Sequence, residues 1–213
     1  MTFYFVEDYW MYYLEGFKWT ILLAFFAVII SIAWGITLAL FRLSSIKVLS
    51  WFAVAYINFI RGTPLLVQIY LIYYGLSLNL PDYLAAVLAL SVHSGAYIAE
   101  VVRAGIQAVD KGQMEAARSL GMTHGNAMRR IVVPQAIKNI LPALCNEFII
   151  IIKNTSLMSV IGISELMYNV DTIRGNTYLA FEPLIVGAII YFITTYVLKH
   201  LIGILERRLK ASD

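Results

Sequence analysis

Twenty-three residues in succession, from Trp19 to Phe41, carry no charge. At ~1.5 Å per residue, a helix of this length crosses the ~30 Å hydrocarbon core of a bilayer. The run lacks the polar face that a helix packed against a core in water would keep. A membrane-spanning helix is therefore the expected structure.

Four more weakly charged runs follow along the chain, at residues 62–81, 83–99, 139–164 and 183–198. Residues 48–60 are too few to span a bilayer and are expected to lie at its interface or partly within it. Charged residues make up 14% of the chain, against about 25% in a typical soluble domain. The sequence predicts an all-α integral membrane protein with five transmembrane helices, forming a single domain over residues 1–213.

The distribution of Lys and Arg predicts the orientation, because positive charge is retained on the cytoplasmic side. Five spans put the two termini on opposite sides. An N-terminus outside leaves Lys18 and Arg174 outside and Lys153 within a span. The remaining basic residues then lie in or beside the cytoplasm: Arg42, Lys47, Arg61, Arg103, Lys111, Arg118, Arg129, Arg130, Lys138, Lys199, Arg207, Arg208 and Lys210. The C-terminus is expected to be cytoplasmic.

The sizeable cytoplasmic connection, at about residues 104–137, carries a distinctive pattern. Residues 113–120 are mostly good helix formers. Gly121 can supply the left-handed turn that ends a helix, and Pro134 can begin the next one. The expected structure is a short helix, a sharp turn and a return to the membrane. Such a projecting helix is suited to a groove on a partner.

This loop resembles the cytoplasmic loop of importer permeases of the ATP-binding cassette superfamily, through the spacing of Glu115, Ala116, Ala117, Gly121, Ile131 and Pro134. The resemblance implies that the loop is a coupling helix that docks on a separate ATPase subunit. The residues expected to form this ATPase-docking surface are Glu115, Ala116, Ala117, Arg118 and Gly121.

Three further motifs resemble permeases for polar amino acids. They are RGTPLLVQ at 61–68, SGAYIAE at 94–100 with RAG at 103–105, and KNTSL at 153–157 with VIG at 160–162. Together with the loop they cover most of residues 20–205 in the expected order. Structural roles are assigned to the motif residues Arg61, Pro64, Glu100, Arg103 and Lys153.

The resemblance also implies the partners. It predicts two permease subunits, identical or different, each bound to one ATPase, and an extracytoplasmic substrate-binding protein. The complex would lie among lipids in a bacterial-type inner membrane and carry an amino acid; nucleic acid is not an expected partner. The chain lacks the G-x-x-x-x-G-K-[S/T] loop that cradles phosphates. We therefore expect ATP and Mg to bind the ATPase partner, with no enzyme activity, cofactor or metal site here.

Glu147 and Lys153 are charged residues at membrane depth, where a charge costs at least ~2.5–3.5 kcal/mol on insertion scales. One hypothesis places the Glu147 carboxylate in the translocation path, opposite the cationic side chain of arginine, lysine or histidine. The alternative is a helix–helix hydrogen bond or a pair with a basic residue. For Lys153 we expect a structural contact with a backbone carbonyl or an acidic residue, with a substrate contact as the alternative.

Other polar residues are candidates for substrate binding. The run Asn154, Thr155 and Ser156 loosens the helix and offers backbone groups to a zwitterion.

In the third span, His93, Tyr97 and Glu100 share one face, so His93 and Tyr97 are pathway candidates. Glu100 and Arg103 are three residues apart and are expected to pair. Glu165 and Asp171 are weaker candidates for a carboxylate in the path.

Three other functions stay open at this point. A passive channel would need no ATPase, and an ion-coupled carrier usually has more spans and inverted repeats. A membrane assembly subunit would need no solute path, so it would tolerate apolar residues at 147 and 153.

Overall fold

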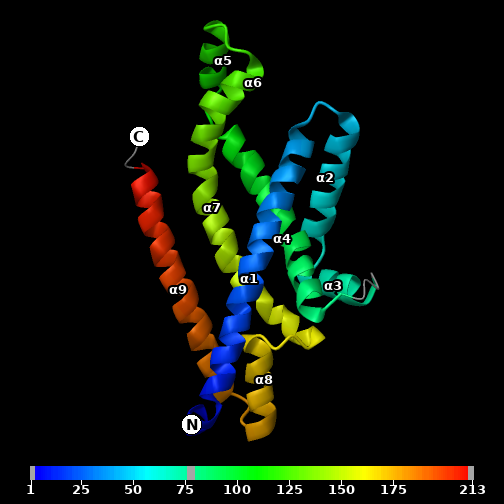
Figure 1. The fold of residues 1–213 in the computed structure, drawn as a ribbon, viewed down its shortest axis with the longest axis vertical. Coiled ribbons are helices and arrows are strands. Elements are labelled where there is room, and N and C mark those ends of the chain that lie inside the picture. The colour runs from blue at the N-terminus through cyan, green and yellow to red at the C-terminus, as the bar shows by residue number, and fades with distance from the viewer. Residues whose placement is uncertain (1–2, 76–79, 211–213) are drawn as a thin grey trace.

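The computed structural model describes residues 3–75 and 80–210, and within these ranges every regular element is helical. Figure 1 shows most helices running along the long axis of the molecule. The N-terminus and α8 (Leu166–Thr177) lie at one end, which we call the N-terminal end. The small helices α5 (Lys111–Ser119) and α6 (His124–Ala127) lie at the opposite end.

Four helical stretches in the described residues are long and apolar enough to cross a membrane. They are α1 (Phe5–Leu43), α4 (Asp82–Gln107), the continuous run His124–Ile161 and the part of α9 (Glu182–Lys210) from Glu182 to Ile204. The run His124–Ile161 joins α6, the π-helix η2 (Met128–Val132), α7 (Val133–Asn154) and the 3₁₀ helix η3 (Thr155–Ile161). It starts well before residue 139, where the hydropathy pattern placed it.

The second expected span, residues 62–81, is not one helix. Instead α2 (Lys47–Gly62) meets α3 (Leu65–Tyr70) and the π-helix η1 (Leu71–Gly75) at a bend of 111°. Pro64 causes the break, because it forces Thr63 into an extended conformation that no helix contains. The chain has five candidate spans if this bent pair counts as one. Residues 76–79 of the expected span 62–81 lie outside the described residues.

Of the two placements expected for residues 48–60, at the membrane interface or partly within the membrane, the packing of α2 favours the second. This helix lies alongside α1 in Figure 1, and its buried residues Ala53, Ile57 and Ile60 pack in a cluster with residues of α1 and α4. The Tyr56 hydroxyl joins the three helices: it accepts a hydrogen bond from Trp34 Nε1 at 2.9 Å and donates one to the Val92 carbonyl at 2.8 Å. Residues 48–60 are therefore part of the helix bundle.

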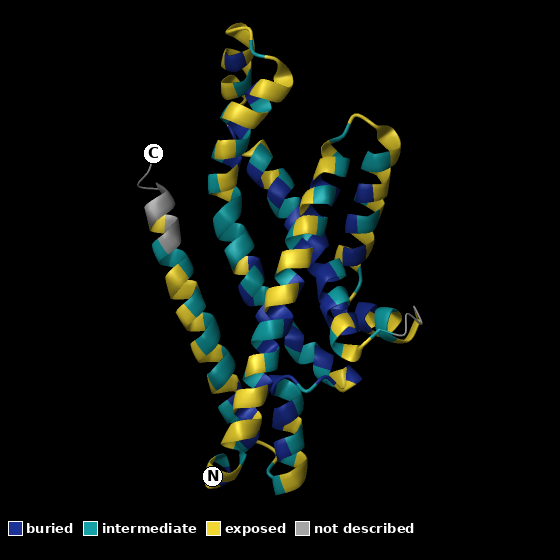
Figure 2. Ribbon diagram, viewed as in Figure 1, coloured by how far each residue is buried: buried dark blue, intermediate teal, exposed yellow. Residues whose placement is uncertain are grey.

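The α1 and α4 helices approach closely at two glycines. A Cβ on Gly35 would lie 2.5 Å from Ile98 Cγ2, and one on Gly95 would lie 2.7 Å from Trp34 Cδ1. Small residues at helix interfaces let backbones come together where lipid gives no hydrophobic drive to association. This contact places α4 at the centre of the bundle, and Figure 2 shows it as the most continuously buried helix.

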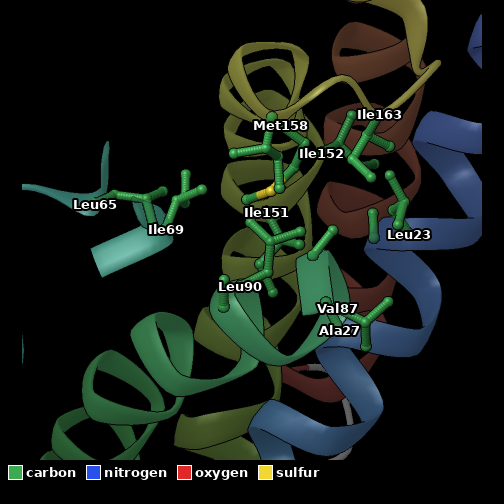
Figure 3. Packing of buried hydrophobic residues seen from close by; sticks show 14 residues of the cluster. Leu23, Ala27, Leu65, Ile69, Val87, Leu90, Ile151, Ile152, Met158 and Ile163 are labelled. Carbon is green, nitrogen blue, oxygen red and sulfur yellow. The ribbon is translucent and has the colours of Figure 1, made fainter. Parts of the chain in front are cut away.

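An apolar cluster joins α1, α4, α7 and η3. Figure 3 shows the side chains of Leu23, Val87, Ile152, Met158 and Ile163 pointing toward one another from different segments. In contrast, α9 is mostly exposed or half-buried in Figure 2, with 6% of its most apolar window buried. The core therefore holds α7 against α1 and α4 and leaves α9 on the outside.

The first part of the loop at 104–137 has the predicted form, a short helix ended by a sharp turn. Asp110 caps α5 by accepting a hydrogen bond from Gly112 N at 2.8 Å. Gly121 has φ +83°, and Met122 N donates to the Ala117 carbonyl at 3.1 Å, which closes the helix in a Schellman-type turn. Pro134 does not begin a helix, although it was expected to: Val132 and Val133 are already helical, and Pro134 lies inside the continuous run that starts at His124.

Candidate functional site

Glu147 lies in the middle of α7 and is 9% exposed. On the same helix face, Leu144 packs in the cluster of α1, α2 and α4, while Ile151 is buried in the cluster of α1, α3, α4 and η3. The carboxylate therefore lies between two apolar clusters. The helix–helix hydrogen bond considered from the sequence is not formed between Glu147 and any other residue that the structure describes.

The helix does loosen at the polar run, because α7 ends at Asn154 and η3 begins at Thr155. Thr155, however, is fully buried, and its hydroxyl donates to the Ile152 carbonyl at 2.8 Å. It was expected to contact substrate and instead packs inside the chain. Asn154 and Ser156 are half-buried, and the Ser156 hydroxyl donates to the Lys153 carbonyl at 2.7 Å.

Lys153 also differs from its expected role. Its side chain is exposed, and within residues 3–75 and 80–210 it forms no hydrogen bond or ion pair with a carbonyl or an acidic residue. Six positions separate it from Glu147, which places the two side chains on different helix faces. Glu147 points into the bundle, and Lys153 points out of it.

His93 has a partner that the sequence did not reveal. Its Nδ1 lies 2.9 Å from Oε1 of Gln68, which is 3% exposed. The amide nitrogen of Gln68 donates to the carbonyls of Ile60 (2.8 Å) and Thr63 (3.1 Å). Because carbonyls accept only, these bonds fix the amide orientation, and Oε1 must accept a hydrogen from His93 Nδ1. Gln68 ends the motif at 61–68, which was the available signal for it.

Tyr97 joins the same group. Its ring centroid lies 5.0 Å from that of His93, and the Arg61 guanidinium carbon lies over the Tyr97 ring at 5.4 Å from its centroid. These contacts connect α4 with α2 through Arg61 and with α3 through Gln68. The six predicted substrate-binding residues therefore divide into an α4 group, His93 and Tyr97, and a group on α7 and η3 that contains Glu147.

Glu100 lies among three arginines. It pairs with Arg42 of α1, with Arg103 at 2.9 Å and with Arg61 of α2 at 3.8 Å. The pair with Arg103 was expected, and the other two arginines come from helices distant in sequence. One carboxylate thus joins α1, α2 and α4 at the end of the bundle opposite the N-terminus, a structural role.

Glu165 is completely buried between η3 and α8. It caps α8 by accepting from Tyr168 N at 2.8 Å, and it accepts from the hydroxyls of Tyr191 (2.9 Å) and Thr20 (3.4 Å). Burial raises the pKa of the Glu165 carboxyl, and these hydrogen bonds oppose the rise. The sequence suggested a pathway carboxylate here, whereas the structure shows a carboxylate enclosed by the protein.

The expected docking residues lie on α5 and the turn after it. Glu115, Ala116, Arg118 and Gly121 are exposed. Ala117 is 4% exposed and packs against its own chain, so it does not belong to the accessible surface. Leu120, which the motif did not single out, is 85% exposed at the same turn.

Comparison with known proteins identifies the family. Residues 27–211 match the family described as the binding-protein-dependent transport system inner membrane component. The chain belongs to this family. It is thus a permease-type membrane component, as the four sequence motifs indicated, and with its apolar helices a multi-pass protein of the inner membrane.

Two relatives come from Bacillus subtilis (strain 168). This permease is 40% identical over 203 residues to the probable glutamine ABC transporter permease protein GlnM, with 94% of each chain covered. It is 39% identical over 204 residues to the arginine transport system permease protein ArtQ, with 94% of this chain and 93% of that protein covered. These relatives are permease subunits.

Two solved structures show the same fold. A chain of an amino acid ABC transporter crystallised with histidines has a TM-score of 0.93 and 50% sequence identity, covering 98% of this permease and 100% of that chain. A chain of the MetNI methionine ABC transporter in an inward-facing conformation has a TM-score of 0.71 and 20% sequence identity. The match covers 98% of this permease and 99% of that chain. The second likeness concerns the fold alone.

Proposed function

We propose that this permease forms the translocation path of an ATP-driven amino-acid importer and prefers basic amino acids. The observation that carries the proposal is Glu147, a buried carboxylate in the middle of a spanning helix. A charge at this depth usually marks a solute path. The relatives named for glutamine and arginine support a polar amino acid as cargo.

The carboxylate favours a cationic cargo. A guanidinium forms two parallel hydrogen bonds with a carboxylate, and the pair removes the cost of burying either charge alone. Asn154 lies on the same face of α7 two turns later, at about 10 Å along the axis. In this arrangement Glu147 binds the cationic end of the cargo, while Asn154 and Ser156 bind its amino-acid end. His93 and Tyr97 shape the adjoining wall.

Coupling to ATP hydrolysis is assigned to the α5 tip. Its exposed residues Glu115, Arg118 and Leu120 offer charge and apolar surface to an ATPase subunit, which binds ATP and Mg. The tip lies at the end opposite the N-terminus, consistent with an N-terminus outside and a coupling loop at 104–137 in the cytoplasm. The C-terminus is then cytoplasmic.

A second permease subunit, identical or different, completes the path. The apolar helix α9 is largely uncovered in the single chain, which leaves it available to lipid and to such a subunit. The described residues contain no separate folded unit for solute capture, so an extracytoplasmic substrate-binding protein delivers the cargo.

The test is uptake in proteoliposomes that contain the permease, its ATPase and its binding protein. ATP-dependent arginine uptake is measured against unlabelled lysine, histidine, glutamine and glutamate. Competition by lysine and histidine alone supports the basic preference. Competition by glutamine or glutamate keeps the importer and removes that preference, and uptake that is indifferent to ATP overturns the proposal.

A further inference from the structure

Glu165 is a completely buried carboxylate that belongs neither to the proposed cargo site nor to the coupling loop. It follows Gly162, whose φ of +83° ends η3, and it precedes α8. A buried carboxylate is retained at a net cost unless its oxygens are hydrogen-bonded. Both carboxylate oxygens of Glu165 accept hydrogen bonds, and the donors come from three parts of the chain.

The bonds join helices that are far apart in sequence. Oε1 accepts from Tyr168 N of α8, while Oε2 accepts from Tyr191 of α9 and Thr20 of α1. The Thr20 hydroxyl in turn accepts from Leu166 N at 3.1 Å, so α1 is bonded twice to the start of α8. The carboxylate therefore fixes α1, α8 and α9 relative to one another.

The same cluster reaches the polar turn at the end of α7. The Tyr191 side chain also packs against the apolar cluster that contains Ile152, at the end of α7, and Met158 of η3. Thr155 is the first residue of η3 and stands between Asn154 and Ser156, the two half-buried polar residues that the proposed function assigns to the cargo. A shift of Tyr191 would therefore move Thr155 and its two neighbours.

The attachment adds to two other contacts of α9, a hydrogen bond from the Tyr13 hydroxyl to the Pro183 carbonyl and apolar packing against α8. The most apolar window of α9 is 6% buried, and Tyr191 lies in the better packed half nearest the N-terminal end, beside Ile190. We infer that Glu165 is a positioning residue: through Tyr191 it fixes α9 and the Thr155 turn against α1, and so keeps Asn154 and Ser156 aligned with the path. The inference rests on the proposed function.

The test uses four variants in the reconstituted complex. Tyr191→Phe removes the donor, Glu165→Leu removes the acceptor, and Glu165→Gln keeps an acceptor oxygen. Tyr196→Phe makes the same chemical change as Tyr191→Phe at an exposed position on α9 and serves as the matched control. Each variant is measured for assembly with the ATPase, for ATP hydrolysis stimulated by the loaded binding protein, and for arginine uptake per ATP hydrolysed.

We expect Tyr191→Phe to assemble normally and to lose about tenfold in uptake per ATP, the size expected for one hydrogen bond to a carboxylate. Glu165→Gln should keep most of the uptake, and Tyr196→Phe should match the wild type. In the Glu165→Leu background, Tyr191→Phe should have no further effect, because the bond is already absent.

The inference and the proposed function would be contradicted by different results. If Tyr191→Phe equals Tyr196→Phe while the wild type imports arginine, the inference is overturned and the proposed function stands. The double variant could instead lose uptake per ATP by the product of the two single losses. That result would also overturn the inference, because the two side chains would then act independently. If the wild type imports no amino acid, the proposed function itself is wrong.

Discussion

The side-chain oxygen of Gln68 lies 2.9 Å from Nδ1 of His93, while the amide nitrogen of Gln68 donates to the carbonyls of Ile60 and Thr63 at the C-terminal end of α2. The break at Pro64 leaves the last carbonyls of α2 without helical partners. Gln68 satisfies two of them and joins the bend to α4. The bend of 111° is thus held by a side chain that is itself buried.

Replacing Gln68 with Met should destabilise the fold. The change keeps the volume but leaves the carbonyls of Ile60 and Thr63 unpaired, a loss of about 2 kcal/mol. Thermal unfolding in detergent should show a lower Tm than the wild type. Gln113→Met, an exposed change on α5, is the control. Equal Tm values for the two variants would contradict the role assigned to Gln68.

Glu147→Gln should change selectivity rather than assembly. The variant keeps the side-chain shape but removes the charge, so we expect arginine uptake to fall by about tenfold, as for a lost charge-assisted pair. Glutamine uptake should change less. The measurement is initial uptake of both amino acids by equal amounts of assembled complex. Unchanged affinity for arginine would assign Glu147 a structural role.

Replacing Glu100 with Gln should destabilise the end of the bundle that carries the three arginines. Arg42, Arg61 and Arg103 would then repel one another without a central carboxylate, at a cost of about 2 kcal/mol. The Tm should fall further than in Arg61→Met, because Arg61 is the most distant and most exposed of the three. A larger fall for Arg61→Met would contradict this order.

Gly105→Ala should disrupt the α4–α7 contact. An added Cβ would lie closer to Ile140 Cγ1 than van der Waals contact allows, and overpacking of this kind costs about 1–3 kcal/mol. Gly203→Ala in α9 meets open space and is the matched control. The yield and Tm of the two variants check the prediction, and equal behaviour would show that α7 can shift freely.

Leu120→Ser should weaken ATPase binding without changing the permease fold. The side chain is 85% exposed at the α5 turn, so its loss removes apolar contact area from the proposed interface and nothing from the core. Co-purification with the ATPase should fall while the Tm stays unchanged. Tyr178→Ser, an exposed change at the N-terminal end, should leave co-purification intact.

The local features of this permease were predictable from local rules. The uncharged runs located α1, α4 and α9, since a helix in lipid must be apolar over its length. Gly121 ended α5 because it acts through its own backbone angles, whereas Pro134 did not begin a helix and lies inside the run that starts at His124. The motif around Pro64 was visible as a pattern, although the bend that it produces was not.

The sequence by itself determined that α1, α4 and α9 are long and apolar enough to span a membrane and that α5 ends at Gly121. The tertiary structure alone decided which way each side chain points: Thr155 and Ala117 face inward, Lys153 outward, and Glu165 and Gln68 toward partners more than twenty residues away. The reason is physical. Membrane insertion depends on the summed hydrophobicity of the residues within one segment. The hydrogen bonds of a buried polar group depend instead on donors and acceptors that only the packing of distant helices supplies.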